Sequence, residues 1–174
     1  MFYLIDGYNL ALDSGLSRTL SGPGNPERVR SRLLMWLASR LEDAERARTT
    51  VVFDAKRHSV DKAELIEQGI RVLFAVDYPD ADSMIEVLIS KHSAPKLLTV
   101  VSSDQRLHTA AQRRRASAIR SAEWFEQIDN RPRLKLPTSD SDEKPPLGDR
   151  EKLISEFDTA EIQRLIDDEN EIGP

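Results

Sequence analysis

The chain has 174 residues, with 25 Lys and Arg against 30 Asp and Glu, and a formal net charge of −5. It contains no cysteine, which excludes disulfides, thiolate metal sites and a cysteine nucleophile. It has neither a signal-peptide pattern nor an apolar run of the roughly 20 residues that span a bilayer, so we expect a cytoplasmic protein with no membrane partner.

The charges are unevenly distributed along the chain. Residues 91–136 carry ten Lys and Arg against four Asp and Glu, whereas residues 137–174 carry four against twelve. The overall negative charge disfavours a nucleic-acid partner, but the basic segment favours one. The alternative is that these basic side chains only keep one face of the protein soluble.

The first half of the chain alternates between strand and helix patterns. Residues 2–5 predict a short buried strand. Residues 27–46 predict a helix, because apolar residues recur there at three- and four-residue spacing after Pro26. Residues 50–53 are β-branched and predict a second strand. Residues 63–68 predict a brief helix that Gly69 ends.

The same alternation continues to residue 128. Patterns of the same two kinds predict strands at residues 70–76, 97–101 and 116–120 and helices at residues 82–91, 104–115 and 122–128. A β-α-β-α order predicts an α/β fold with a central, mostly parallel sheet of four to five strands, covered by helices on both faces.

The composition changes abruptly after residue 136. Residues 137–150 are rich in Pro, Ser and Asp and predict a flexible linker. Residues 151–174 carry spaced apolar residues among many acids and predict an acidic helical tail. We therefore expect one folded domain at residues 1–136, followed by this linker and tail.

Acidic residues follow four successive predicted strands. Asp6 and Asp54 come directly after the first two, Asp80 and Asp82 follow the third, and Asp104 follows the fourth. The carboxyl ends of parallel strands meet at one edge of a sheet, so these carboxylates should converge. Two unit charges about 4 Å apart repel by roughly 4 kcal/mol at an effective dielectric of 20. The pattern therefore predicts a site for a hard cation, Mg²⁺ or Mn²⁺.

Each of these acids taken singly also has an ordinary structural interpretation. Asp82 and Asp104 fit as N-caps of the helices that follow them, and Glu86 fits as a surface residue one turn after Asp82. Asp6 precedes a glycine, as turn residues often do. Asp80 is interpreted as loop polarity. Caps and turns alone do not readily explain acids at four successive strand ends.

Four segments in order resemble a known family. They are Ile-Asp-Gly-Tyr-Asn-Leu at residues 5–10, Val-Val-Phe-Asp-Ala at 51–55, Ala-Asp-Ser-Met-Ile-Glu at 81–86 and Val-Ser-Ser-Asp at 101–104. Together they resemble the NYN domain, and within it the YacP-like branch, a PIN-like ribonuclease family. The resemblance runs over residues 2–128. It implies a PIN-like three-layer sandwich, metal-dependent phosphodiester cleavage and a single-stranded RNA substrate. The branch's best-understood member is a ribosome-associated endoribonuclease, so the ribosome is a second expected partner.

The resemblance also implies roles for particular residues. Asp6, Asp82 and Asp104 correspond to the catalytic and metal-binding acids, and Asn9 completes the first motif. Asp54 matches a further acid that either binds the metal directly or supports the site, and Glu86 matches a peripheral acid. The implied nucleophile is a metal-activated water, which leaves 5′-phosphate and 3′-hydroxyl ends.

Basic residues close to these acids in sequence are candidates for contacts with RNA phosphates. They are Arg106, Arg113, Arg114, Arg115, Arg120, Lys56 and Arg57. Three adjacent arginines cannot all point the same way from one helix. The second hypothesis is a catalytically weak RNA- or ribosome-binding module that keeps the PIN-like fold. The oligomeric state does not follow from the sequence.

Overall fold

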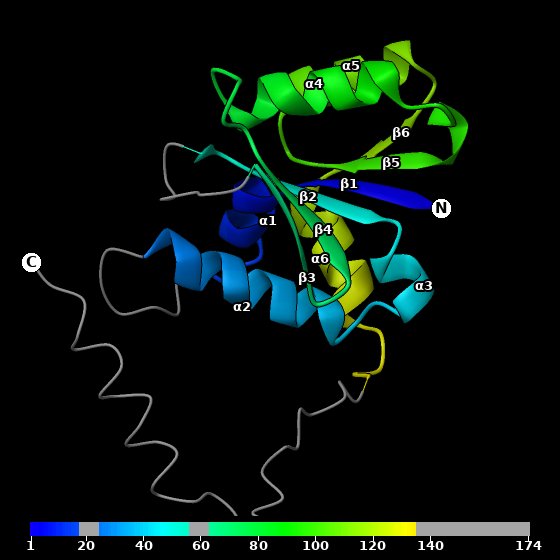
Figure 1. The fold of residues 1–174 in the computed structure, drawn as a ribbon. Helices are drawn as coiled ribbons and strands as arrows, with labels where there is room; N and C mark the ends of the chain where they lie inside the picture. The colour runs from blue at the N-terminus through cyan, green and yellow to red at the C-terminus, as the bar shows by residue number, and fades with distance from the viewer. Residues whose placement is uncertain (18–24, 56–62, 135–174) are drawn as a thin grey trace, which may run out of the picture. The chain divides into compact units, whose positions relative to one another are not determined.

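The computed structural model describes residues 1–17, 25–55 and 63–134 (Figure 1). The predicted linker and acidic tail lie outside these residues, as do the candidate RNA contacts Lys56 and Arg57. In the part of the chain that is described, no helix is long and apolar enough to cross a membrane.

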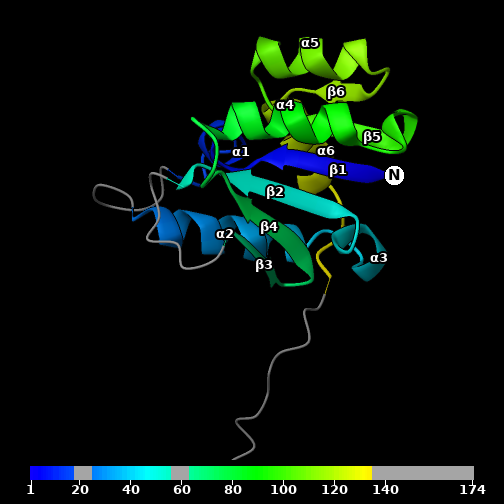
Figure 2. The ribbon, with the colours of Figure 1, turned by 45° about the horizontal axis from the view of Figure 1, so that its top comes forward.

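A six-stranded sheet forms the centre of the domain (Figure 2). Its strands are β1 (Phe2–Asp6), β2 (Thr49–Phe53), β3 (Glu64–Glu67), β4 (Ile70–Phe74), β5 (Leu98–Val101) and β6 (Ser117–Ile119). The spatial order is β3-β4-β2-β1-β5-β6, and every pair is parallel except β3 with β4. The five parallel strands therefore share one carboxyl edge, where they end, and one amino edge, where they begin.

Helices cover both faces of this sheet (Figure 1). They are α1 (Gly7–Asp13), α2 (Pro26–Ala38), α3 (Asp43–Arg46), α4 (Ala81–Lys91), α5 (Gln105–Arg113) and α6 (Ser121–Asp129), with a 3₁₀ turn, η2, at Pro95–Leu97. Helices α1, α2 and α6 pack on one face, and α4 and α5 on the other. The expected three-layer α/β sandwich is thus confirmed.

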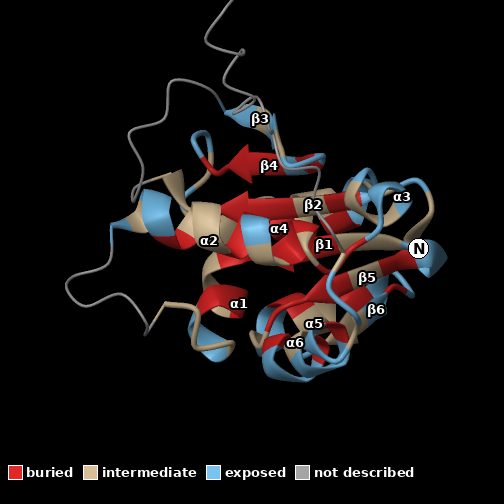
Figure 3. Ribbon diagram, turned by 90° about the horizontal axis from the view of Figure 1, so that it is seen from below, coloured by how far each residue is buried: buried red, intermediate tan, exposed pale blue. Residues whose placement is uncertain are grey.

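Two hydrophobic cores follow from the alternation of side chains along each strand. Ile5 joins the core beneath α1, α2 and α6, whereas its neighbour Leu4 joins the core beneath α4 and α5. Val51 and Val52 divide between the two cores in the same way. Figure 3 shows the central strands β1, β2, β4 and β5 mostly in the colour of buried residues, as expected of strands that helices cover on both faces and whose sequences are largely apolar.

One predicted helix is wrong: the segment at residues 63–68 contains strand β3. It pairs antiparallel with β4, so the sheet has six strands and not four to five. Gln68 and Gly69 have φ values of 54° and 78°, and two successive positive φ angles suit the tight turn of a hairpin. The glycine that resembled a helix stop is therefore a hairpin residue.

The predicted helix at residues 27–46 is interrupted. Helix α2 ends at Ala38, where the Ser39 hydroxyl donates to the Trp36 carbonyl, and the separate short helix α3 begins at Asp43. Leu41 lies between the two and is nevertheless fully buried. Apolar residues thus recur at helical spacing across the gap between α2 and α3, so the sequence pattern did not reveal where the first helix ends.

Candidate active site

Asp6 lies where β1 passes directly into α1. Its carboxylate caps that helix by accepting a hydrogen bond from the Asn9 backbone N–H at 3.1 Å. The side chain is largely buried, with 7% of the residue's surface exposed. Gly7 begins α1 instead of making a turn. The ring of Phe53 occupies the place of a side chain at this position: a Cβ on Gly7 would lie 2.4 Å from Phe53 Cε1. This close packing fixes Asp6 at the carboxyl edge of the sheet.

The interpretation of Asp82 as the N-cap of α4 is wrong. Asp80 is the N-cap, and its carboxylate accepts a 2.7 Å hydrogen bond from the Ser83 backbone N–H. Asp82 therefore stands in the first turn of the helix, partly exposed. The interpretation of Asp80 as loop polarity is wrong, and the capping pattern Asp80–Ser83 was the signal that would have identified it.

Asp104 caps α5, as expected of an acid at that position, by accepting a 2.6 Å hydrogen bond from the Arg106 backbone N–H. Ser102 connects it to Asp6: the buried Ser102 hydroxyl donates to Asp6 Oδ2 at 3.3 Å and accepts from the Asp104 backbone N–H at 3.1 Å. The sequence around Ser102 did not indicate this role in the site. It lies 96 residues from Asp6, and no local pattern reveals such a contact.

A small cavity of about 140 Å³ opens between these elements at the carboxyl edge. It is lined by four acidic residues, Asp6, Asp54, Asp80 and Asp82, together with Tyr8 and Ala81. The Tyr8 ring packs edge-on against Phe53, with ring centroids 5.4 Å apart. The structure thus brings Asp54 to the same cavity as Asp6 and Asp82, whereas Asp104 does not line it.

The electrostatics show that these carboxylates act on one another. The pKa of Asp6 is raised from 3.8 to about 6, chiefly by burial and further by the charges of Asp82 and Asp104, against the hydrogen bonds from Asn9 and Ser102. Burial also raises the pKa of Asp82, and the charges of Asp104 and Asp80 add to that effect. The site therefore concentrates negative charge that a cation would relieve.

The donor set suits a hard divalent cation, because it consists of carboxylate oxygens. Within residues 1–17, 25–55 and 63–134, however, no group of three or more acidic, histidine or cysteine side chains is arranged to hold a metal ion. The chemistry of the residues fits Mg²⁺ or Mn²⁺, while their present spacing is that of neighbouring carboxylates and not of a closed ligand shell.

Asn9 joins three separate segments around the cavity. Its side-chain oxygen accepts hydrogen bonds from the Ser103 backbone N–H at 3.1 Å and from the Ser121 hydroxyl at 3.2 Å. Ser103 follows β5, and the buried Ser121 begins α6. Asn9 thus holds together the segments that surround Asp6. The sequence motif that contains Asn9 did not indicate contacts with Ser103 and Ser121.

Glu86 and Arg106 form a two-pronged ion pair beside the acids. Arg106 Nε and Nη2 donate to the two oxygens of Glu86 at 2.9 and 2.7 Å, which links α4 to α5. The charge of Arg106 lowers the pKa of Asp82, and that of Glu86 raises it. Glu86 is therefore engaged by an arginine, and Arg106 is the candidate RNA contact that lies within electrostatic reach of the acids.

Three of the other candidate RNA contacts lie at the opposite edge of the sheet, and one lies at the carboxyl edge. Helix α5 starts at the carboxyl edge and returns toward the amino edge, so Arg113, Arg114 and Arg115 are about 10 Å or more along the helix axis from Arg106. Arg114 donates to the His92 carbonyl at 3.3 Å. Arg120 is the N-cap residue of α6, at the carboxyl edge beyond β6.

Comparisons with known proteins give a consistent assignment. No curated protein matches the chain. Two crystal structures of Rae1 (YacP) from Bacillus subtilis match its fold: one has 21% identity and a TM-score of 0.56, and a point mutant has 23% identity and a TM-score of 0.52. In both cases the match covers 74% of each chain. The family model described as the YacP-like NYN domain matches residues 3–165. The chain therefore belongs to the YacP-like NYN domain family.

Proposed function

We propose that this protein is a metal-dependent endoribonuclease that cleaves single-stranded RNA. Its family is nuclease-like, and its fold is the PIN-like one. The observation that carries the proposal is the convergence of Asp6, Asp82 and Asp104 from three separate segments: the charges of Asp82 and Asp104 raise the pKa of Asp6, and the charge of Asp104 raises that of Asp82. A protein that only bound RNA would gain nothing from clustered negative charge where phosphates approach.

The acidic residues of the site differ in how firmly the fold holds their side chains, and we assign their roles accordingly. Asp6 is buried and fixed by Ser102 and the α1 backbone, whereas Asp82 projects from the first turn of α4 with more freedom. These two acids would hold the ion, with Asp54 beside them in the cavity and Asp104 behind Ser102. When bound, Mg²⁺ or Mn²⁺ lowers the pKa of a water and offsets charge on the attacked phosphate.

The surroundings supply contacts for the RNA strand. Arg106, oriented by Glu86, presents positive charge beside the acids for a phosphate group. Tyr8, which lines the cavity, offers a ring for a base to stack on. Hydrolysis by water would leave 5′-phosphate and 3′-hydroxyl ends. The family resemblance extends the proposal to messenger RNA on the ribosome, in the cytoplasm.

The test is cleavage of a fluorescent, unstructured RNA oligomer during titration with Mg²⁺ or Mn²⁺, with EDTA added at the end. We expect cleavage that EDTA stops. Asp82→Asn should lower the rate on the order of 100-fold or more, since it removes a ligand and several kcal/mol of charge stabilisation. Glu126→Gln, an exposed acid on α6, is the matched control and should retain the rate. Unchanged cleavage in both Asp6→Asn and Asp82→Asn would refute the proposal.

One observation favours the second function, a catalytically weak RNA-binding module. The carboxylates of Asp6 and Asp104 both accept backbone hydrogen bonds at helix starts, so part of their capacity serves the fold. If that were their whole purpose, the oligomer would bind but remain intact at every metal concentration. The same titration separates the two functions, because binding and cleavage are read from the same labelled RNA.

A further inference from the structure

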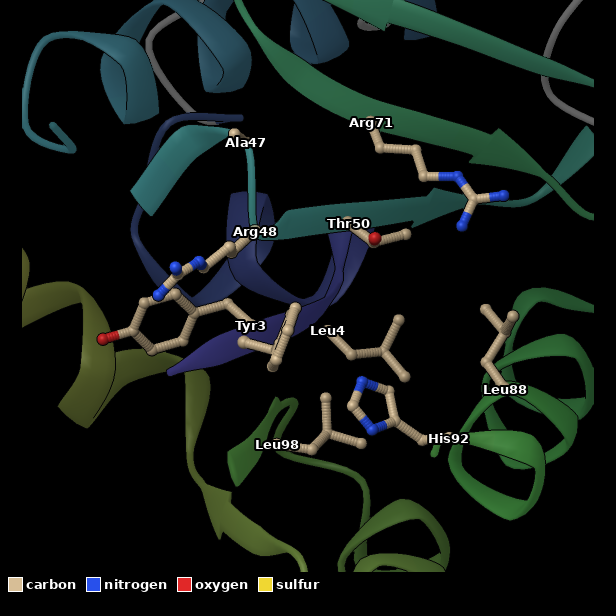
Figure 4. Close-up of a pocket in the computed structure, with 10 residues that line it drawn as sticks. Tyr3, Leu4, Ala47, Arg48, Thr50, Arg71, Leu88, His92 and Leu98 are labelled. Atoms are coloured by element: carbon tan, nitrogen blue, oxygen red, sulfur yellow. The ribbon is translucent and has the colours of Figure 1, made fainter. Parts of the chain in front are cut away.

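A second cavity, of about 250 Å³, lies at the amino edge of the sheet (Figure 4). Leu4, Leu88 and Leu98 form apolar walls, and Phe2 also lines it. Phe2 and Asp6 stand at opposite ends of β1, about 13 Å apart along the strand, so this cavity opens at the edge opposite to the carboxylates. It therefore plays no part in the site at the carboxyl edge.

Hydrogen-bond donors and aromatic rings line this cavity together. The guanidinium of Arg48 lies 6.0 Å from the centre of the Phe2 ring. His92 packs edge-on against the same ring at 5.2 Å, and its Nδ1 accepts a hydrogen bond from the Ala94 backbone N–H. When neutral, this imidazole therefore carries its proton on Nε2, which makes that atom a donor. Figure 4 shows Arg48 and Arg71 on two sides of the cavity, with Thr50 between them.

The surface around this cavity carries surplus positive charge. Three of the carboxylates near it are matched by cations: Glu64 pairs with Arg71, Asp43 with Arg46, and Glu45 with Arg131. The cationic residues at the starts of the parallel strands and the ends of the helices that precede them have no carboxylate partner among the described residues. These exposed residues are Arg48, Lys91, Lys96, Arg113 and Arg115. The amino edge is thus cationic where the carboxyl edge is anionic.

We propose that this amino-edge cavity is a second RNA-binding site, which takes one nucleotide of a strand. The base would pack beside Phe2 and His92, its phosphate would meet Arg48, and neighbouring phosphates would meet the surplus cations. The combination of an apolar, ring-lined hollow with flanking cations matches a nucleotide better than an acidic peptide, which offers charge without a planar ring. The inference rests on the proposed function only in taking RNA as the substrate.

The two sites have a consequence for substrate length. An RNA long enough to reach both edges gains affinity from the second site, because that interaction forms within an already bound complex. An oligomer of about five nucleotides bound at the carboxylates would not gain it. In the cleaving protein, Arg48→Ala should therefore raise KM for a 20-nucleotide RNA while leaving kcat, and the kinetics of the short oligomer, unchanged.

The direct test measures binding without cleavage. In the full chain carrying Asp82→Asn, fluorescence anisotropy gives the Kd of a labelled 20-nucleotide unstructured RNA. Arg48→Ala should weaken binding roughly fivefold or more, and the slope of log K against log salt should fall by about 0.7 for each phosphate that the variant no longer neutralises. Arg28→Ala, an exposed arginine on α2, is the matched control and should change neither.

A second variant tests the cavity separately from its charge. Ala47 is exposed and lines the cavity, so Ala47→Trp fills it without removing a cation. We expect weaker RNA binding with an unchanged salt slope. Equal binding by Arg48→Ala and Arg28→Ala, or no effect of Ala47→Trp, overturns the proposal. So does competition by poly-glutamate as effective as that by poly-uridine. These experiments measure RNA binding and not cleavage, so they test the second site even if the protein proves not to be a nuclease.

Discussion

Asp6 combines structural and chemical demands in one side chain. It caps α1, accepts the Ser102 hydroxyl and is 7% exposed, yet it must bear a charge near other acids at neutral pH. Hydrogen bonds lower its pKa, but burial raises it more. The protein thus keeps a carboxylate where folding alone would favour a neutral group.

The burial of the charged Asp6 side chain should make the stability of the folded protein depend on pH. Because the folded-state pKa of Asp6 is raised from 3.8 to about 6, the folded state holds its proton more tightly than the unfolded state does. The contribution of Asp6 to stability is therefore most favourable below about pH 4 and is lost as the pH rises through 6. A shift of this size corresponds to about 3 kcal/mol at most.

Asp6→Asn should consequently increase the free energy of unfolding at pH 7.5 by about 1–3 kcal/mol, and the gain should shrink toward pH 4.5. Urea denaturation at both pH values measures it. A gain of the same size at both values would show that the burial of charge is not its source.

Gly7 is required by its contact with Phe53, and its substitution is a second prediction at this scale. A Cβ there would meet three atoms of the Phe53 ring at 2.4, 2.7 and 2.8 Å, and that ring is fully buried. Gly7→Ala should destabilise the fold by about 1–3 kcal/mol, as other overpacking substitutions do. Leu12→Ala, at a 57% exposed position of the same helix, is the control in thermal or urea unfolding and should change stability far less.

Among the elements, the connection between α1, the loop after β5 and α6 depends on the side chain of Asn9. Its oxygen serves Ser103 and Ser121 together, and both contacts are long-range. Removal of the Asn9 side chain therefore leaves donors in two other segments without their acceptor.

A double-mutant cycle should detect this coupling. Asn9→Ala and Ser121→Ala are each expected to cost about 1–2 kcal/mol of unfolding free energy. The double variant should cost less than the two together, with a coupling of roughly 0.5–1 kcal/mol. Strictly additive effects in urea denaturation would mean that the two residues act independently.

The same elements show how far sequence reasoning reaches. The sequence predicted the parallel strands, most of the helices and the acids at the strand ends. Apolar runs followed by Asp are local patterns, which can be recognised without knowing the fold. Strand β3 was not: Gly69 fits a helix stop and a hairpin equally, and only its pairing with β4 decides. Asp80 was identifiable by its cap, but the contact of Ser102 with Asp6 depends on two segments meeting in space.

At the scale of the whole domain, acidic and basic side chains of the described residues gather at different edges of the sheet. The carboxyl edge gathers the acids, with Arg106 beside them, whereas Arg113, Arg114 and Arg115 lie at the amino edge. Helix α5 connects the two edges: it starts next to Asp104 at the carboxyl edge and ends in consecutive arginines at the amino edge.

Metal binding should therefore stabilise the folded domain independently of any RNA. Saturating Mn²⁺, at about 100 times its Kd, should add roughly 2.7 kcal/mol and raise Tm. The rise should be smaller at pH 5.5 than at pH 7.5, because a proton on Asp6 competes with the ion. In a thermal-shift assay Glu126→Gln should behave like the wild type, whereas Asp82→Asn should lose most of the rise. Equal shifts in both variants would place the ion elsewhere.

The wide sequence spacing around Asp6 also affects how the protein matures. Ser102 is synthesised 96 residues after Asp6, and Ser121 is synthesised 112 residues after Asn9. A nascent chain consequently cannot complete the arrangement until synthesis has passed α6. The order of translation therefore delays the assembly of this site until the domain is nearly whole.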